Sequence, residues 1–188
     1  MDEDGYFGER VAATYDESAA EMFEPAAVDP AVEFLAALAG GGRALELGIG
    51  TGRMALPLAR REAQVACFRN AAAHLGPGAC FVIEVMVPDL RRLPPGQTAV
   101  PFTVSPTVWA FDIYDVATQA MSSNYVELAD GHGEYSSIPF RYAWPAELDL
   151  MAQLAGMRLR ERWDGWTREP FTSESRQHVS VWEKGDGR

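Results

Sequence analysis

The residues with the clearest chemical meaning are an acid and three glycines in the stretch 44–53, ALELGIGTGR. Leu45 and Leu47 predict a short buried strand, because a strand that is covered on both faces is apolar. The glycines that follow let the backbone turn sharply and lie close to a bound molecule, with no Cβ in the way. Glu46 stands near the carboxyl end of the strand, where open α/β sheets bind their ligands. The stretch therefore predicts a ligand-binding turn between a strand and a helix.

The spacing of the glycines argues against two common nucleotide sites. A dinucleotide site has the pattern G-x-G-x-x-G, whose last glycine lets the helix pack closely on the strand. Here Gly48, Gly50 and Gly52 give G-x-G-x-G, and Arg53 follows. A phosphate-binding P-loop also needs a Lys-Ser or Lys-Thr pair after its glycines, and this chain has none there. The two alternatives that stay open are a different cofactor site and a glycine-rich turn in some other α/β protein.

At these residues the chain resembles the class I S-adenosylmethionine-dependent methyltransferases, whose first motif is a hydrophobic strand, an acidic residue and G-x-G-x-G. The resemblance implies an enzyme with a Rossmann-like α/β sheet that transfers a methyl group from S-adenosyl-L-methionine to a small-molecule acceptor. It also implies that the pair Tyr15-Asp16 closes over the methionine end of the cofactor, the alternative being a tyrosine packed on the domain surface. The cofactor-binding residues that the resemblance implies are Tyr15, Glu46, Gly48, Gly50, Thr51 and Gly52.

The segment after the first motif is shorter than the resemblance requires. In the family the first helix leads to a strand that ends in Asp or Glu, whose carboxylate holds both ribose hydroxyls, and further strands follow. In this chain no acid stands between Glu62 and Glu84, and one apolar helical face runs from Met54 to Leu75. We therefore expect a single helix over about 51–75 and the loss of the ribose- and adenine-binding segment.

Three explanations are open for the short segment. The chain is a naturally shortened relative, or its coding sequence carries a deletion or a prediction error near Arg61-Glu62, or another fold shares one motif. An apolar strand at 79–87 after Leu75-Gly-Pro-Gly favours the first two, because the family has Leu-x-Pro-Gly-Gly before such a strand. A single crossover helix would make the strands 44–47 and 80–87 parallel. Two functional classes follow: a methyltransferase with weakened cofactor binding, and a non-catalytic remnant or binding module on the same scaffold.

No catalytic residue can be assigned from the sequence. The three histidines, His74, His132 and His178, have no partner visible in the sequence, and no Cys/His cluster has metal-ligand spacing. No Gly-x-Ser-x-Gly elbow is present. In the resembled family the cofactor carries the reactivity, and the protein supplies proximity and alignment. A general base is needed only if the acceptor must lose a proton.

Length, charge and cysteine content limit the number of domains, the partners and the location of the protein. The 188 residues predict one methyltransferase-like domain over 1–188. A net charge of -11 argues against nucleic acid and anionic membranes as partners. Two cysteines, Cys67 and Cys80, are too few for a disulfide framework, and the N-terminus lacks the features of a signal peptide. These observations predict a cytoplasmic protein.

An inserted lobe is expected over 105–143. Alternating residues after Trp109, and a hairpin turn at 130–133 (DGHG), predict a three-stranded antiparallel meander. In relatives that methylate sugars or other small molecules, such an insertion covers the acceptor pocket or pairs subunits, which would make a homodimer. The aromatic residues that suit either role, or that fill the core of the lobe, are Trp109, Phe111, Tyr114, Tyr125, Phe140 and Tyr142.

Flanking patterns predict the elements around this site. A helix is expected to begin at Asp29-Pro30 and to end at Gly40-Gly41-Gly42. The segment 88–105 is expected to be a surface connection. Another helix is expected over 145–154, with Leu148, Met151 and Leu154 turned inward. Strands at 157–163 and 178–183 would then complete the antiparallel end of a methyltransferase sheet.

Overall fold

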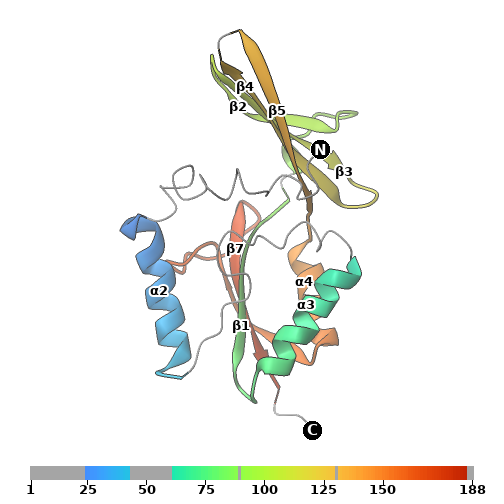
Figure 1. Cartoon of the computed structure of the whole chain (residues 1–188). Helices are drawn as coiled ribbons and strands as arrows, with labels where there is room; N and C mark the ends of the chain where they lie inside the picture. Colours follow the sequence, from blue (N-terminus) through green and yellow to red (C-terminus); the bar gives the residue numbers. More distant parts are fainter. Residues whose placement is uncertain (1–23, 43–60, 89, 130, 186–188) are drawn as a thin grey trace.

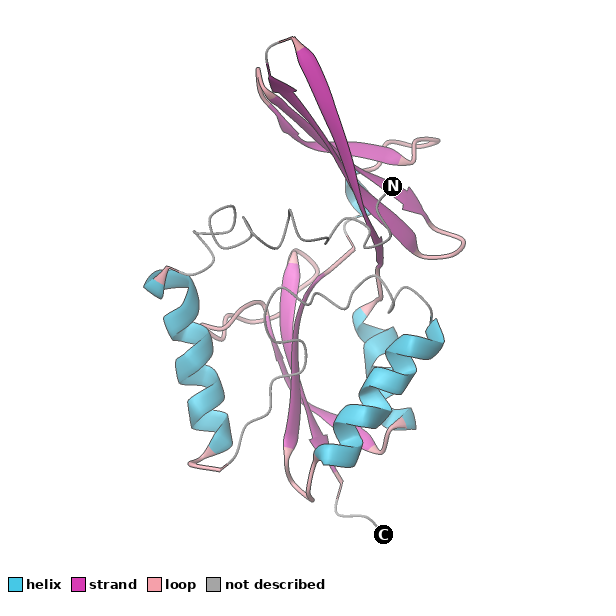
Figure 2. Cartoon of the chain, in the orientation of Figure 1, coloured by secondary structure: helices cyan, strands magenta, loops and turns pink. Residues whose placement is uncertain are grey.

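The computed structural model describes residues 24–42, 61–88, 90–129 and 131–185. The described elements are the helices α2 (Pro25–Ala39), α3 (Arg61–His74) and α4 (Pro145–Leu154), the 3-10 helix η4 (Leu90–Arg92), and the strands β1 (Cys80–Met86), β2 (Ala99–Val104), β3 (Val108–Asp115), β4 (Ala120–Ala129), β5 (His132–Arg141), β6 (Met157–Trp163) and β7 (Gln177–Lys184). They form a core, which contains the helices α2 to α4 with β1, β6 and β7, and a lobe, which contains β2 to β5 (Figures 1 and 2).

The core is a three-stranded antiparallel sheet in the order β1-β7-β6, with helices on both faces (Figure 1). The central strand β7 is fully buried from His178 to Trp182. Val179 and Val181 face α2 and pack around Phe34, whereas Trp182 packs on the other face with α3 and α4. The structure confirms the two strands that the sequence predicts at this end of the sheet. The predicted strand 44–47, and its pairing with β1, lie outside the described residues.

Helix α2 begins at Pro25, so the expected start at Asp29-Pro30 is wrong. Pro25 occupies the first helical position, where the missing N–H costs nothing. Pro30 lies inside the helix and forfeits a single backbone bond near its start. The helix ends as expected at Gly40, whose left-handed φ of 56° lets its N–H bond to the carbonyl of Ala36.

Helices α3 and α4 pack together against the opposite face of the sheet. In α3 the expected helix is seen from Arg61, and its expected first part lies outside the described residues. In α4 Leu148 and Met151 are buried as expected, but Leu154 is 58% exposed. Leu154 follows Leu148 by six positions, which places it about 240° around the helix axis, away from the core. None of the described helices is long and apolar enough to cross a membrane.

The lobe is a four-stranded antiparallel sheet in the order β2-β3-β4-β5, one strand more than the sequence predicts. The extra strand β2 lies in the segment expected to be a surface connection. Its proline, Pro101, obscures the strand pattern, but an edge strand tolerates a proline because one side of its ladder is unpaired. The predicted hairpin is present between β4 and β5, although His132 already pairs with Ala129 instead of lying in the turn.

The two faces of the lobe sheet have different surroundings. The inner face carries Tyr114 and Phe140, which pack with Tyr142 and η4. The opposite face, here called the outer face, carries Trp109, Phe111 and Ile113. Trp109 is 50% exposed and Ile113 is 40% exposed. Part of the aromatic set therefore fills the base of the lobe, while Trp109 stays available at the surface.

Candidate functional site

None of the residues that the sequence predicts to hold the cofactor can be placed. All of them lie outside the described residues: Tyr15, Glu46, Gly48, Gly50, Thr51 and Gly52. The motif therefore stays a prediction. The described structure places the carboxyl end of β1 and the surfaces between α2 and the loop that joins β6 to β7.

The carboxyl end of β1 is tied to the loop before β7. The N–H of Val87 donates to the carbonyl of Arg176 at 2.8 Å, and Pro88 is buried. Glu84 is the only acid in the sequence 63–88, and it is exposed. It lies in the middle of β1, opposite Val179, and not at the strand end where a ribose-binding acid would stand. Glu84 therefore does not occupy the position that the resemblance assigns to a ribose-binding acid.

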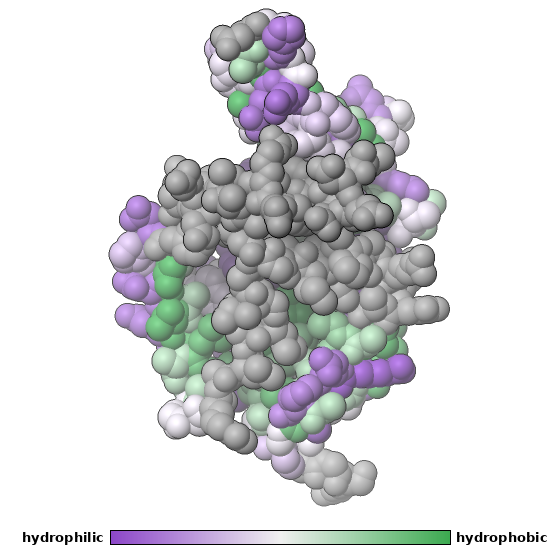
Figure 3. All heavy atoms as spheres, in the orientation of Figure 1, coloured by the Kyte–Doolittle hydropathy of each residue, from purple (hydrophilic) through white to green (hydrophobic). Residues whose placement is uncertain are grey.

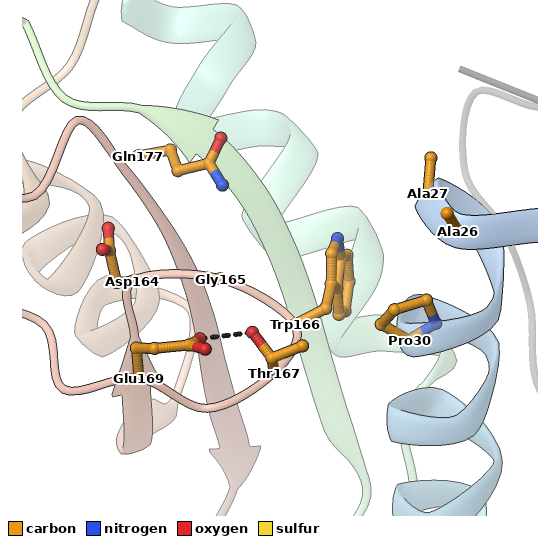
Figure 4. Close-up of a pocket in the computed structure, with 9 residues that line it drawn as sticks. All are labelled: Ala26, Ala27, Pro30, Asp164, Gly165, Trp166, Thr167, Glu169 and Gln177. Atoms are coloured by element: carbon orange, nitrogen blue, oxygen red, sulfur yellow. Dashed lines mark hydrogen bonds between the residues drawn. The ribbon is translucent and has the colours of Figure 1, made fainter. Parts of the chain in front are cut away.

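A pocket of about 260 Å³ lies between the N-terminal part of α2 and the loop that joins β6 to β7 (Figure 4). The Trp166 ring and Pro30 face each other across it, and Asp164, Glu169 and Gln177 supply polar groups. The Thr167 hydroxyl donates a hydrogen bond to Glu169, which lowers the pKa of that carboxyl. The pocket thus combines an aromatic wall with two carboxyl groups, those of Asp164 and Glu169.

A second hollow, of about 430 Å³, continues from this pocket along α2. Its base is formed by Phe34, whose ring meets Trp166 edge-on at 5.5 Å between centroids. The guanidinium of Arg168 lies 4.7 Å from the centroid of the Phe34 ring. Arg168 has a left-handed φ of 67°, a conformation that non-glycine residues rarely adopt. In the sequence this loop is marked only by two nearby tryptophans, Trp163 and Trp166.

The three histidines lie in different parts of the described structure. His74 is exposed and bonds to the carbonyl of Asn70, and His132 is exposed at the start of β5. His178 is fully buried, with its Nδ1 atom 2.7 Å from the Ser180 hydroxyl. Burial, and then the charge of Arg162, lower the pKa of His178 to about 4. In the described part of the chain no group of three His, Cys, Asp or Glu side chains could hold a metal ion.

A polar cluster that the sequence did not reveal lies beside His178. The Asp149 carboxylate accepts from both terminal nitrogens of Arg162, at 2.6 and 3.2 Å, and from the indole N–H of Trp182 at 2.9 Å. The Nε–H of Arg162 donates to the Ser180 hydroxyl at 2.7 Å. This cluster joins α4, β6 and β7, so it fixes the geometry of the core sheet.

The chain matches solved structures of methyltransferases, whereas no protein-family model and no curated protein sequence matches it. It aligns with the CcbJ methyltransferase from Streptomyces caelestis at 34% identity and a TM-score of 0.59, over 68% of this chain and 52% of that one. An S-adenosylmethionine-dependent methyltransferase from Clostridium acetobutylicum aligns at 9% identity and a TM-score of 0.49, over 66% and 52%. The amino pentose methyltransferase CalS10 from Micromonospora echinaspora aligns at 17% identity and a TM-score of 0.41, over 64% and 50%.

The fold is that of a methyltransferase with an added antiparallel lobe, as the sequence predicts. Its similarity to CcbJ in both sequence and fold makes the chain a shortened relative of the class I S-adenosylmethionine-dependent methyltransferases. The chain spans about half the length of the solved structures that it matches. This partial coverage agrees with the short segment after the first motif.

Proposed function

We propose that the chain binds S-adenosyl-L-methionine weakly and transfers its methyl group to a small-molecule acceptor. The observation that carries the proposal is the 34% identity to CcbJ, a methyltransferase, combined with the turn 48–52. The cofactor, when bound, supplies a reactive sulfonium methyl group. The glycines allow the backbone to approach its amino-acid end, and Tyr15 would close over the same end.

Weak binding is proposed because the ribose-binding acid is missing. Hydrogen bonds to a charged group contribute about 1.5–3 kcal/mol each. A carboxylate that holds two ribose hydroxyls is therefore worth about 3–5 kcal/mol, which is roughly a hundred- to several-thousand-fold in affinity. Two further observations support a missing segment. No residue of β1 is fully buried, and α2 exposes an apolar stripe, visible over α2 in Figure 3, of Val28, Val32 and Leu35.

Titration calorimetry with S-adenosyl-L-methionine tests this proposal. We expect a dissociation constant in the millimolar range, because the turn 48–52 binds without a ribose clamp. Gly50→Ala should abolish the remaining heat, since a Cβ would block the close approach. Gly133→Ala is the matched control: its Cβ would meet Leu128 and Val126 at 3.5 and 3.6 Å, which is ordinary contact, so binding should not change.

The same titration separates the alternative function. A non-catalytic remnant or binding module would give no heat with any of the three proteins, and the absence of any acid from the sequence 63–83 favours this second candidate. A micromolar dissociation constant would contradict weakened binding and would mean that another acid lines the nucleoside pocket.

The two cysteines, Cys67 and Cys80, are free, which supports a reducing, cytoplasmic location.

We also propose that the lobe, an insertion over 105–143 that β2 extends, pairs two copies of the chain through its outer face. This face exposes Trp109 and Ile113, and their partners across β4 are Val126 and Ser122. Phe111 and its partner Asn124, between these two pairs on the same face, are also uncharged, and the first charged residue of β3 on this face is Asp115 at the end of the strand. The chain as a whole carries a net charge of -11. Two such chains repel each other over most of their surfaces, so an uncharged apolar face is where they can approach.

Light scattering during size-exclusion chromatography tests the homodimer. We expect twice the monomer mass for the unaltered chain and the monomer mass for Trp109→Glu, because a carboxylate would be buried without a partner. Leu154→Glu is the control, since Leu154 is equally apolar and 58% exposed but lies on α4 of the core. A monomeric unaltered chain, or a Trp109→Glu variant that stays dimeric, would disprove pairing through this face.

A further inference from the structure

The lobe meets the core at a narrow junction (Figure 1). Among the described elements, two connections cross it, 87–98 and 142–144. Among the described elements, those of the core and those of the lobe share only sparse contacts. Packing at the junction comes mainly from Tyr142, whose ring meets Tyr114 of the lobe and Trp144 at the start of α4. At a junction of this size, a few side chains determine how the lobe is oriented on the core.

Arg141 is the residue on which three separate elements converge. Its side chain is 3% exposed, although it carries a charge. One terminal nitrogen donates to the Glu147 carboxylate of α4 at 2.6 Å and to the side-chain oxygen of Gln119 at 2.8 Å. The other donates to the side-chain oxygen of Gln64 on α3. The last residue of β5 is thus bonded to two core helices and to the turn between β3 and β4.

Gln119 completes this arrangement from the side of the lobe. Its side-chain nitrogen donates to the second oxygen of Glu147 at 2.8 Å, so the carboxylate is held by Arg141 and Gln119 together. Its backbone has a left-handed φ of 61°, which a non-glycine residue adopts at an energetic cost. Burial raises the pKa of Glu147, but the bonds from Gln119 and Arg141 outweigh it, and the net shift is downward.

Burying the charge of Arg141 costs more free energy than filling the same space with an apolar side chain. A buried arginine is stable only when its charge is paired and its donors are satisfied. Here the Nε–H of Arg141 is buried without a hydrogen-bond partner among the described residues. An apolar residue would fill the same space at a lower free-energy cost. What the guanidinium adds is a set of directional hydrogen bonds between the lobe and the core. Its fork of donors reaches Glu147 and Gln64 only when lobe and core hold one relative orientation.

We propose that Arg141 is a positioning residue that locks the lobe in a single orientation on the core. The ion pair between Arg141 and Glu147, together with the hydrogen bonds to Gln119 and Gln64, fixes this orientation. Without these interactions the two connections act as a hinge, because the other polar contacts of the connection 87–98 are exposed to water: Arg91 bonds to Ser173 at 2.7 Å and pairs with Glu174 at 3.5 Å, and Arg92 bonds to Pro101 at 3.0 Å. This inference concerns the chain alone and does not depend on cofactor binding.

Electron spin resonance between one label on the lobe and one on the core measures this orientation directly. His132 at the tip of the lobe and Gln153 on α4 are exposed and suit replacement by cysteine, with Cys67 and Cys80 changed to alanine. The labelled protein is diluted with an excess of unlabelled chain, so that only distances within one molecule contribute. We expect one narrow distance peak for this background.

Arg141→Met should turn the narrow peak into a broad or shifted distribution, because it keeps the length of the side chain but loses every donor. Gln119→Gly provides a second test that does not leave a buried charge unpaired. It relieves the strained φ and removes the side-chain bonds of Gln119 to Arg141, to Glu147 and to the carbonyl of Tyr142, so the lobe stays folded while the peak broadens. Arg158→Met is the matched control, since it breaks an exposed pair with Glu183, at 3.1 Å, inside the core. The proposal fails if both junction variants keep the narrow peak, or if Arg158→Met broadens it equally.

Discussion

Replacing Asp149 with alanine is expected to lower the free energy of unfolding by about 3–5 kcal/mol, the range measured when one partner of a buried ion pair is removed. Asp149 accepts three hydrogen bonds, two from Arg162 and one from Trp182. The Arg162 side chain is only 13% exposed, and Trp182 is fully buried. The variant therefore leaves a charge and an indole N–H inside the core without an acceptor, which costs more than the bonds themselves are worth.

Urea unfolding followed by circular dichroism measures this loss. Glu183→Ala is the matched control, because Glu183 also pairs with an arginine between β6 and β7. Its partner Arg158 is 72% exposed, so water replaces the lost carboxylate and the change should be about 0–1 kcal/mol. Asp149→Asn keeps an acceptor for Trp182 and should fall between the two. Equal losses for Asp149→Ala and Glu183→Ala would contradict the importance of burial in this pair.

The elements with strong local signals were predictable from the sequence. The helix at 145–154 has a proline at its first position and a glycine soon after its end, and both bounds are confirmed. The strand at 157–163 is confirmed to the residue, although a bulge between Leu159 and Glu161 interrupts its alternation. The first motif predicted the family, and the similarity to CcbJ agrees with it. The residues of the motif itself lie outside the described structure, so their roles stay predictions.

The missed features depend on partners that are distant in the sequence. Pro101 hid β2, and only its pairing with β3 identifies it as a strand. The buried face of β3 was not predictable, because it is decided by contacts with η4 and Tyr142. Both polar clusters were also missed. The bond from Arg141 to Gln64 spans 77 positions, and no local pattern announces a pair at that separation.

The fully buried His178 is expected to make the fold less stable as the pH falls from 6.5 to about 4. The Ser180 hydroxyl accepts from the Nε–H of Arg162 and lies 2.7 Å from Nδ1 of His178, so it can donate to that nitrogen when the imidazole is neutral. A second proton on the ring would lie in a fully buried site beside the charge of Arg162. Burial and Arg162 therefore hold the pKa of His178 at about 4, against 6.5 in the unfolded chain.

The direction of this pH dependence follows from the number of protons that His178 binds in the folded and in the unfolded chain. Above pH 6.5 the imidazole is neutral in both, and it has no effect on the pH dependence of stability. Below pH 6.5 the unfolded chain takes up a proton that the folded chain refuses until about pH 4. Unfolding is therefore favoured by about 1.4 kcal/mol per pH unit, and the loss amounts to about 3 kcal/mol in total.

Urea unfolding at intervals between pH 7 and pH 4.5 measures this slope. His178→Asn removes the titrating group and offers an amide oxygen to Ser180, so its stability should fall less steeply than that of the unaltered chain, by about 1.4 kcal/mol per unit. His132→Asn, at an exposed position on the lobe, should keep the full slope. The remaining slope of the His178 variant reports the carboxylates, which titrate at lower pH. Parallel curves for the unaltered chain and His178→Asn would mean that the buried imidazole is protonated in the folded state, and that Asp149 outweighs Arg162 beside it.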